Sequence, residues 1–512
     1  MAIKRYKATA DTTIVNAFLP GWKLRATGSN MGMADVMEVF SIYGRVTSGS
    51  QELSRLLIKF PTTTISSDRT AGTVPASGSV SFYLRLFNAQ HSKTVPSDYK
   101  LAVNPIFTDW QEGTGLDLET YRDATHGNVG SNWMSASNTA AWNSVSGGGD
   151  WLSSSADYRY EQSFSTGLED LEIDITPLVE RWIKGAGAGG IANYGVGVKL
   201  SSSYEARATG STGTDQSVQN NPLGATKSYY TKRFFARGSQ YFFKQPVIEA
   251  RWNSSRTDDR GDFYHSSSLA SAAENLNTIY LYNYVRGVLR DIPNITNGDP
   301  IFVNVYSGSL YNTGPSGSAI TQVLYTPATG GWVSTGIYSC SLCIASSSNS
   351  PNPIFDVWSS GSTQYFSGTI APLDLSGFQT VAKPVYYLNI TNLKGRYRSN
   401  ENARFNLYIR NKNWNPTIYT SAQADPPATT IHSASYRVYR TLDAYEAIPY
   451  GTSSELSTLL SYDVSGNYFD FDMDSLEPGY TYAFKFAFYD PALASWTEQP
   501  ESFKFRVEDY EY

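Results

Sequence analysis

The chain has 512 residues and a net charge of −6, with 17% charged and 14% aromatic residues. Its length allows about three or four domains with sizeable apolar cores. Phosphate binding needs a basic face, so the acidic balance and the lack of a long Lys or Arg run argue against nucleic acid as a partner. No apolar run reaches about 18 residues, so we expect no membrane insertion.

Residues 1–253 have the pattern of short strands separated by loops rich in Gly, Ser and Asn. Apolar and polar residues alternate along most of the apolar runs, which is the period of a half-buried strand. One short helix is expected at Thr176–Ile183, with Thr176 as N-cap, Pro177 in the first turn and Gly185 as the stop. Strands are expected at Val36–Val46, Arg55–Phe60, Val80–Phe87, Leu171–Ile175, Tyr194–Leu200 and Pro246–Trp252.

The pattern continues in two further segments, residues 254–380 and 381–512. The run Leu476–Tyr482 resembles the turn and tyrosine that precede a late strand in immunoglobulin-like domains. We therefore predict an all-β chain of three tandem β-sandwich domains: a jelly-roll-type domain at 1–253 and two smaller immunoglobulin- or fibronectin-like domains at 254–380 and 381–512. Their strands are expected at Thr278–Tyr282, Ile301–Tyr306, Thr321–Tyr325, Ile354–Trp358, Pro384–Ile390, Arg404–Arg410, Ser435–Arg440, Tyr468–Asp472, Thr481–Phe488 and Phe503–Val507.

The first segment also contains an ordered series of short motifs. They are Ala10-Asp-Thr-Thr-Ile14, Ser54–Phe60, Leu84–Phe87, Trp110-Gln-Glu-Gly-Thr114, Gly147-Gly-Gly-Asp150, Ile173-Asp-Ile-Thr176, Asn193-Tyr-Gly-Val196 and Pro246–Glu249. With these motifs in this order, residues 8–253 resemble the DNRLRE-type domain, a β-sandwich related to carbohydrate-binding modules. Two loops, Gly28–Gly32 and Phe235–Gly238, depart from the family's pattern, so a calcium or ligand role is not carried over to them.

Four tryptophans of this segment are candidates either for packing or for binding a glycan. Trp110, Trp133, Trp142 and Trp182 each bring a large apolar area. A sugar platform would expose two or three aromatic faces in one groove, whereas packing would bury them. The sequence favours packing.

No pattern in the sequence assigns a catalytic, cofactor or metal site. Cys340 and Cys343 form the only Cys-x-x-Cys, and a structural zinc site would need two more ligands. We expect both cysteines on or beside a strand. The four histidines lie in polar stretches and are expected at the surface: His91, His126, His265 and His432.

The most acidic stretches are Asp258–Asp262 and Asp470–Asp474. We expect them on solvated loops or strand faces. Calcium is an alternative because hard cations take clustered oxygen ligands. A carboxylate pair for glycoside hydrolysis is a third interpretation. Asp174 and Thr176 are expected to cap the short helix.

The N-terminus, Met1–Tyr6, lacks the apolar core of a signal peptide, and two cysteines are few for an extracellular chain of this size. Virion proteins meet both conditions, because they are made in the host cytoplasm and leave by lysis. Tyr436–Arg440 and Leu460–Asp470 are similar to repeated β-domains of tailed-bacteriophage structural proteins.

This resemblance implies a virion component of the tail, collar or head. Such a component oligomerises and docks on the virion, while its exposed loops bind neighbouring virion proteins or host-surface glycan. The alternatives are a glycan-binding adhesin and a polysaccharide depolymerase, which would need two exposed carboxylates about 5–10 Å apart. We expect the chain not to be an enzyme.

Overall fold

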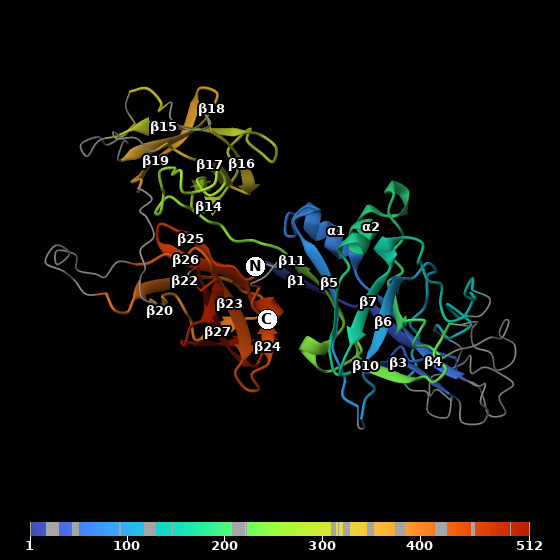
Figure 1. The fold of residues 1–512 in the computed structure, drawn as a ribbon. Coiled ribbons are helices and arrows are strands. Elements are labelled where there is room, and N and C mark those ends of the chain that lie inside the picture. Colours follow the sequence, from blue (N-terminus) through green and yellow to red (C-terminus); the bar gives the residue numbers. More distant parts are fainter. Residues whose placement is uncertain are drawn as a thin grey trace. The chain divides into compact units, whose positions relative to one another are not determined.

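The computed structural model divides into two compact units, residues 2–252 and 253–512 (Figure 1). The division lies between residues 252 and 253, one position before the predicted boundary at 253/254. The predicted boundary at 380/381 and the strand predicted at Thr321–Tyr325 lie outside the described residues. No helix in the described part of the chain is both long and apolar enough to span a membrane. The structure describes residues 2–16, 30–43, 51–91, 94–116, 130–144, 147–206, 221, 223–308, 314–315, 317–320, 328–345, 353–373, 384–414, 428–451, 456–491 and 493–510.

The first unit is a sandwich of two antiparallel sheets. The four-stranded sheet has the order β1-β11-β5-β8, so the first and last strands of the unit pair with one another. The seven-stranded sheet has the order β10-β3-β4-β9-β6-β7, with β2 paired to β4. These strands are β1 (Ile3–Lys7), β2 (Ala10–Val15), β3 (Val36–Tyr43), β4 (Gln51–Lys59), β5 (Ser81–Leu86), β6 (Tyr99–Pro105), β7 (Tyr160–Phe164), β8 (Leu171–Asp174), β9 (Val196–Leu200), β10 (Tyr229–Phe235) and β11 (Val247–Arg251).

The core of this unit lies between the two sheets. Alternation along β5 buries Phe82, Leu84 and Leu86, and they share one apolar cluster with Leu101 and Val103 of β6. Side chains that alternate across a strand point to opposite faces, so the predicted period of two explains which residues are buried.

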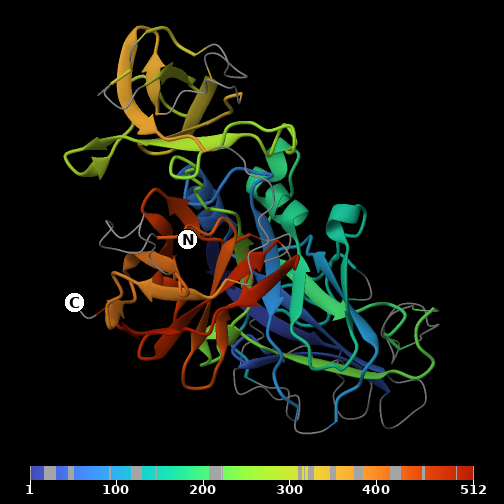
Figure 2. The same cartoon turned by 60° about the vertical axis from the view of Figure 1, so that its left-hand side comes forward.

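Two short helices lie side by side at one end of the first unit (Figure 2). The predicted helix is confirmed as α2 (Thr176–Lys184), which ends at Gly185 with φ of 71°. Thr176 is its first helical residue, and Asp174 Oδ1 accepts hydrogen bonds from Thr176 N at 2.8 Å and Thr176 Oγ1 at 2.5 Å. The N-cap residue is Ile175, and it makes no side-chain capping hydrogen bond, so the prediction of Thr176 as the N-cap is wrong. The Thr176 hydroxyl instead accepts from the Phe82 N–H of β5 at 2.7 Å.

The second helix, α1 (Thr62–Thr70), was not predicted. Thr and Ser dominate its sequence, and Ile65 is its buried residue. Arg69 Nη1 and Nη2 donate to the Glu180 carboxylate of α2 at 2.7 and 2.6 Å, so tertiary contact holds a segment with weak intrinsic propensity. Short 3₁₀ turns occur at Ala156–Tyr158, Ala186–Ala188, Phe242–Lys244 and Met473–Ser475.

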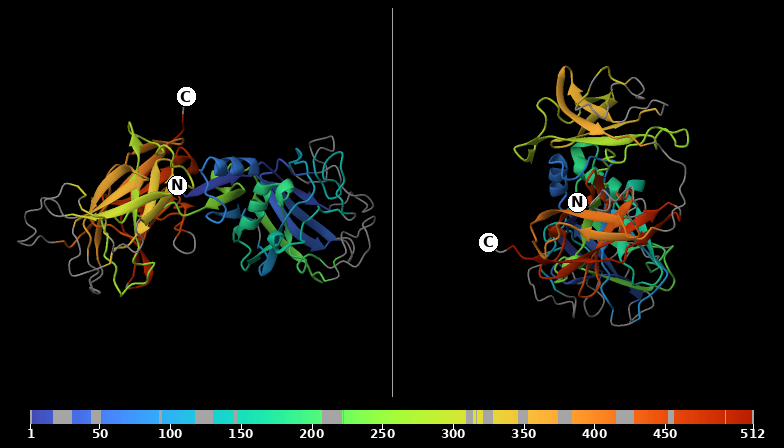
Figure 3. Two further views of the ribbon diagram at one scale, coloured as in Figure 1. Left: turned by 90° about the horizontal axis from the view of Figure 1, so that it is seen from above. Right: turned by 90° about the vertical axis from the view of Figure 1, so that its left-hand side faces the viewer.

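The second unit begins with one curved, six-stranded antiparallel sheet of order β12-β17-β16-β15-β18-β19 (Figure 3). Strand β16 changes partner along its length: Gly330 pairs with Ile301 of β15, and Gly331 pairs with Ser339 of β17. This switch lets one sheet surround a single core. The strands are β12 (Asn277–Tyr282), β15 (Ile301–Ser307), β16 (Ala328–Ser334), β17 (Ile337–Leu342), β18 (Ile354–Ser360) and β19 (Thr363–Ile370), with a separate hairpin of β13 (Tyr284–Val285) and β14 (Val288–Leu289).

The C-terminal part of this unit is a sandwich of two sheets, ordered β20-β22-β26-β25 and β21-β29-β27-β23-β24, with β28 paired to β27. Its core is aromatic, and Phe405, Phe469 and Phe484 pack at centroid distances of 4.9–5.1 Å. The all-β fold with sandwich domains agrees with the prediction. The strands are β20 (Tyr386–Ile390), β21 (Arg396–Arg398), β22 (Asn402–Asn411), β23 (Ala434–Arg440), β24 (Glu446–Ile448), β25 (Ser461–Asp463), β26 (Gly466–Asp472), β27 (Thr481–Asp490), β28 (Ser495–Glu498) and β29 (Phe503–Glu508).

The tyrosine expected before a late strand is Tyr482, at the start of β27. Its buried hydroxyl donates to the Glu477 carbonyl at 2.8 Å. This is the tyrosine-corner contact of immunoglobulin-like sandwiches, which ties the turn back to the strand.

Candidate functional site

The four tryptophans that were candidates for glycan binding are all buried, with exposed fractions of 2–5%. Trp110 and Trp142 lie in a small apolar cluster with Ile14, and their Nε1 atoms donate to the carbonyls of Tyr194 and Asn132. Faces that are already covered cannot stack on a sugar. Packing is therefore the role of the four: Trp110, Trp133, Trp142 and Trp182.

Three residues from separate motifs meet at one point in the first unit. Asp11 is on β2, Glu112 follows β6, and Arg237 follows β10. The backbone N–H of Asp11 donates to Glu112 Oε1 at 2.8 Å, and the backbone N–H of Arg237 donates to Asp11 Oδ2 at 2.6 Å. Arg237 Nε and Nη2 also donate to the two oxygens of Glu112 at 2.7 and 2.8 Å. We call Asp11, Glu112 and Arg237 the motif cluster.

The electrostatics of the motif cluster are those of a buried acid beside an ion pair. Asp11 is 1% exposed. Burial and the neighbouring Glu112 charge raise the Asp11 pKa to about 7, against the lowering effect of the hydrogen bond from Arg237. The Arg237 guanidinium supplies the positive charge that a metal ion would otherwise bring, so the cluster fits a structural junction.

Backbone atoms pack closely around the motif cluster and leave little space there. The Asn30 Oδ1 atom accepts from Gly115 N at 2.6 Å, which ties Asn30 to the residue that follows the Trp110–Thr114 motif. A Cβ at Gly32 would lie 2.3 Å from the Glu112 carbonyl oxygen. In the part of the chain that the structure describes, no group of three or more His, Cys, Asp or Glu side chains is placed to hold a metal ion.

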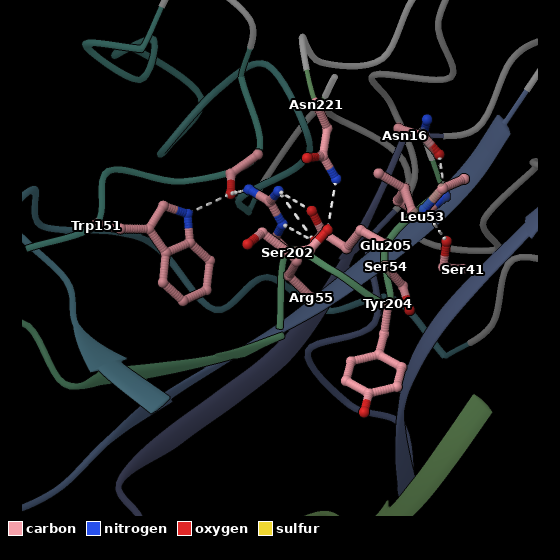
Figure 4. Close-up of polar contacts among 12 residues, drawn as sticks. Asn16, Ser41, Leu53, Ser54, Arg55, Trp151, Ser202, Tyr204, Glu205 and Asn221 are labelled. Atoms are coloured by element: carbon pink, nitrogen blue, oxygen red, sulfur yellow. Dashed lines mark hydrogen bonds and ion pairs between the residues drawn. The ribbon is translucent and has the colours of Figure 1, made fainter. Parts of the chain in front are cut away.

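The sequence missed a second cluster, centred on Arg55 in the middle of β4 (Figure 4). Arg55 is 1% exposed, and its Nε and Nη2 atoms donate to Glu205 at 3.3 and 3.2 Å. Figure 4 shows Arg55 and Glu205 pointing toward one another. The guanidinium also lies 5.0 Å from the Trp133 ring and 5.4 Å from the Trp151 ring. We call these four residues the Arg55 cluster.

The Gly147–Asp150 motif is explained by the Arg55 cluster. Arg55 Nη1 donates to the Gly148 carbonyl at 2.7 Å, and a Cβ at Gly148 would lie 2.7 Å from that same nitrogen. Asp150 accepts from Ser144 N at 2.8 Å, which fixes the neighbouring loop. An arginine within the apolar stretch of β4 is a sequence signal for a buried charge. The sequence does not identify its partner, because Glu205 lies 150 positions away in a polar loop.

The Arg55 cluster has a lysine beside it. Burial, together with the Arg55 charge, lowers the pKa of Lys199 to about 8. The Lys199 Nζ lies 4.6 Å from the Trp151 ring centre, so the amine is held by an aromatic face.

The two acidic stretches fix loops. Asp259 accepts from Thr278 N at 2.7 Å and from the Tyr462 hydroxyl at 2.6 Å. Asp258 is buried, which raises its pKa to about 6. That burial corrects the expectation of a solvated stretch for Asp258, and it follows from its position between strand β12 and Tyr462.

In the second stretch, the carboxylates of Asp470 and Asp472 have local partners. Asp470 accepts from Arg404 Nε at 2.8 Å across β22 and β26. Asp472 Oδ1 accepts from Asp474 N at 3.0 Å and caps a 3₁₀ turn. The expectation of strand faces and loops holds here.

Among the described residues, the cysteines and histidines are not arranged as a catalytic site. Cys340 on β17 and Cys343 just after it are both buried, and burial raises the Cys340 pKa to about 12. A thiol with so high a pKa is inert at neutral pH. His265 is buried, and its backbone N–H donates to the Leu373 carbonyl at 2.9 Å, which corrects the expectation of a surface residue. His126 lies outside the described residues.

No family model matches the chain, and no curated protein matches it in sequence. Among solved structures it is similar to the N-terminal Ig1-2 module of the Drosophila receptor protein tyrosine phosphatase DLAR, at 9% identity and a TM-score of 0.14, over 46% of this chain and 91% of that one. It is also similar to the tandem Ig repeats of Dlar, at 8% identity and a TM-score of 0.13, over 41% of this chain and 84% of that one. The fold assignment rests on the sheets themselves.

Proposed function

We propose that this chain is a non-catalytic structural component of a tailed-bacteriophage virion. It acts by assembly, as a tail, collar or head appendage, with residues 8–253 as a DNRLRE-type domain. One observation carries the proposal: the residues singled out by their motifs, Asp11, Glu112, Gly148 and Asp150, are used to fix loops inside the sandwich. A scaffold that presents fixed loops to neighbours needs this arrangement, and a catalytic centre would leave its acids open to substrate.

Assembly of this kind predicts a closed, symmetric oligomer. Light scattering after gel filtration should give a mass of two or more times the 56.5 kDa of one chain. Assays on bacterial surface polysaccharide should show no turnover. A protein that stays monomeric at every concentration and cleaves polysaccharide would contradict the proposal.

Glycan binding is the second candidate function, because one described pocket suits it. The pocket has a volume of about 250 Å³ in the C-terminal sandwich, and Tyr386, Phe488, Asp490 and Gln499 are among the residues that line it. Tyr386 and Phe488 pack edge to face at 5.5 Å. Aromatic rings with a carboxylate and an amide beside them can contact the C–H face and the hydroxyls of one sugar ring.

Ligand-observed NMR with glucose, galactose and N-acetylglucosamine tests this second candidate. Binding at the pocket predicts saturation transfer that Tyr386→Ala abolishes. Tyr387→Ala is the matched control, because Tyr387 is the next residue of β20 and is exposed. Absence of transfer with the unaltered protein, or equal loss in both variants, would remove this function from consideration.

A further inference from the structure

A buried lysine in the first unit is in contact with an asparagine side chain. Lys232 on β10 is 0% exposed. Its Nζ lies 2.7 Å from Asn88 Oδ1, 2.9 Å from the Gly167 carbonyl and 2.6 Å from the Glu169 carbonyl. The Phe164 ring centre lies 5.1 Å from this nitrogen, so an apolar wall excludes water beside it.

The two side chains come from different sheets. Asn88 follows β5 of the four-stranded sheet, and Lys232 is on β10 of the seven-stranded sheet. An isolated bridge between Asn88 and Phe234 holds the two segments together. Any bond between these side chains would therefore cross from one layer of the sandwich to the other.

Burial favours a neutral, reactive amine, although the three acceptor oxygens around Nζ favour the charged form. Burial lowers the Lys232 pKa to about 8, although Asp170 and Glu169 oppose that shift. A share of the amine is thus neutral near pH 8, and a neutral lysine is a nucleophile. Asp170 Oδ1 accepts from the Asn88 backbone N–H at 2.7 Å, which places a carboxylate next to the asparagine.

We propose that Lys232 and Asn88 join in an intramolecular amide bond. The neutral Lys232 Nζ attacks Asn88 Cγ, the Nζ–Cγ bond forms, and the Cγ–Nδ2 bond breaks. Asp170 takes one proton from Nζ and passes it to Nδ2, which leaves as ammonia, so the carboxylate is unchanged. The remaining Nζ–H donates to one of the two carbonyls that already surround it. The reaction requires no oxidant or cofactor.

The bond would link two positions 144 residues apart and fasten the two sheets to each other. A covalent link across so long a loop restricts the unfolded chain strongly. This modification is independent of the proposed function, because it concerns the stability of one sandwich in any setting.

Mass spectrometry of the intact purified protein tests the proposal. The mass should be about 17 Da below the sequence value, since one ammonia has left. A tryptic digest should contain one branched peptide with Asn88 and Lys232, because the modified lysine resists cleavage. Folded protein that keeps its full mass after incubation at pH 8 would overturn the proposal, as would a lower mass without the branched peptide.

Variants identify the groups that react. Asn88→Ala and Lys232→Met should each restore the mass expected from their sequence. Asp170→Asn should lower the fraction of linked protein, because the proton carrier is lost. Lys504→Met, at an exposed lysine, should keep the full mass difference. Linkage that persists at wild-type level in Lys232→Met or Asn88→Ala would contradict the assignment.

Discussion

Asp11 makes the stability of the first unit depend on pH. It keeps its proton in the folded chain up to a pH of about 7, whereas an unfolded aspartate releases it near pH 4. The folded state holds more protons between these values, so the unfolding free energy that Asp11 contributes falls as the pH rises from about 4 to about 7.

Asp11→Asn keeps an acceptor for the Arg237 N–H and removes this titration. We expect the variant to match the unaltered protein near pH 4 and to be more stable by on the order of 2 kcal/mol at pH 8. Urea unfolding at the two pH values measures the difference. Asp509→Asn, at an exposed residue, should show none. A variant that is less stable at pH 8 than at pH 4, relative to the unaltered protein, would contradict the assignment.

Arg55 contributes to stability in a different way, because its charge is buried together with that of Glu205. Arg55→Met leaves Glu205 as an uncompensated buried charge and removes the contacts with Trp133 and Trp151. We expect a loss of about 3–5 kcal/mol in unfolding free energy, measured by chemical denaturation. Arg396→Met breaks the exposed pair with Glu508 and should lose less than about 1 kcal/mol. Equal losses would show that the Arg55 cluster is not a structural centre.

At the scale of elements, strand β16 depends on the lack of a side chain where it changes partner. A Cβ at Gly330 would lie 2.4 Å from the Ser339 carbonyl oxygen and 3.0 Å from Cys340 Cβ. Gly330→Ala should therefore destabilise the second unit by about 1–3 kcal/mol. A Cβ at Gly331 meets no atom within 4 Å, so Gly331→Ala is the control. In calorimetry, Gly330→Ala should lower the midpoint temperature of one unfolding transition, and Gly331→Ala should change it little. A larger decrease with Gly331→Ala than with Gly330→Ala would contradict this account of β16.

The tyrosine corner fixes the turn before β27. Tyr482→Phe removes the hydroxyl that donates to Glu477 O and should lower the unfolding free energy by about 1 kcal/mol. Tyr387→Phe alters an exposed ring on β20 and should leave the stability unchanged. Thermal unfolding of both variants tests this, and equal effects would mean that the hydrogen bond has no part in stability.

Local pattern predicted many of the strands, because alternation and turn residues act over a few positions, but it did not predict β6, β10, β16 or β17. Every predicted strand within the described residues has a counterpart, and α2 was predicted from its proline and glycine. Helix α1 was not, since the contacts that hold it are long-range: Ile65 packs in the core, and Arg69 pairs with Glu180, 111 positions away. The motif cluster could not be predicted either, because Arg237 lies 226 positions from Asp11 and a single sequence does not show which distant residues are in contact.

At the scale of the whole molecule, the two units use apolar and charged residues in the same way. Apolar strand faces pack inward, and charged side chains are used to hold loops, as Asp150 does in the first unit and Asp472 in the second. This use of acids supports assembly over catalysis as the proposed role.

Quantitative mass spectrometry of density-purified phage particles tests the central claim most directly. The account predicts that peptides of this chain co-purify with the particles, at a fixed ratio to the major capsid protein that matches a symmetric site. Detection of the chain only in the soluble lysate, with none on intact particles, would contradict a role in the virion.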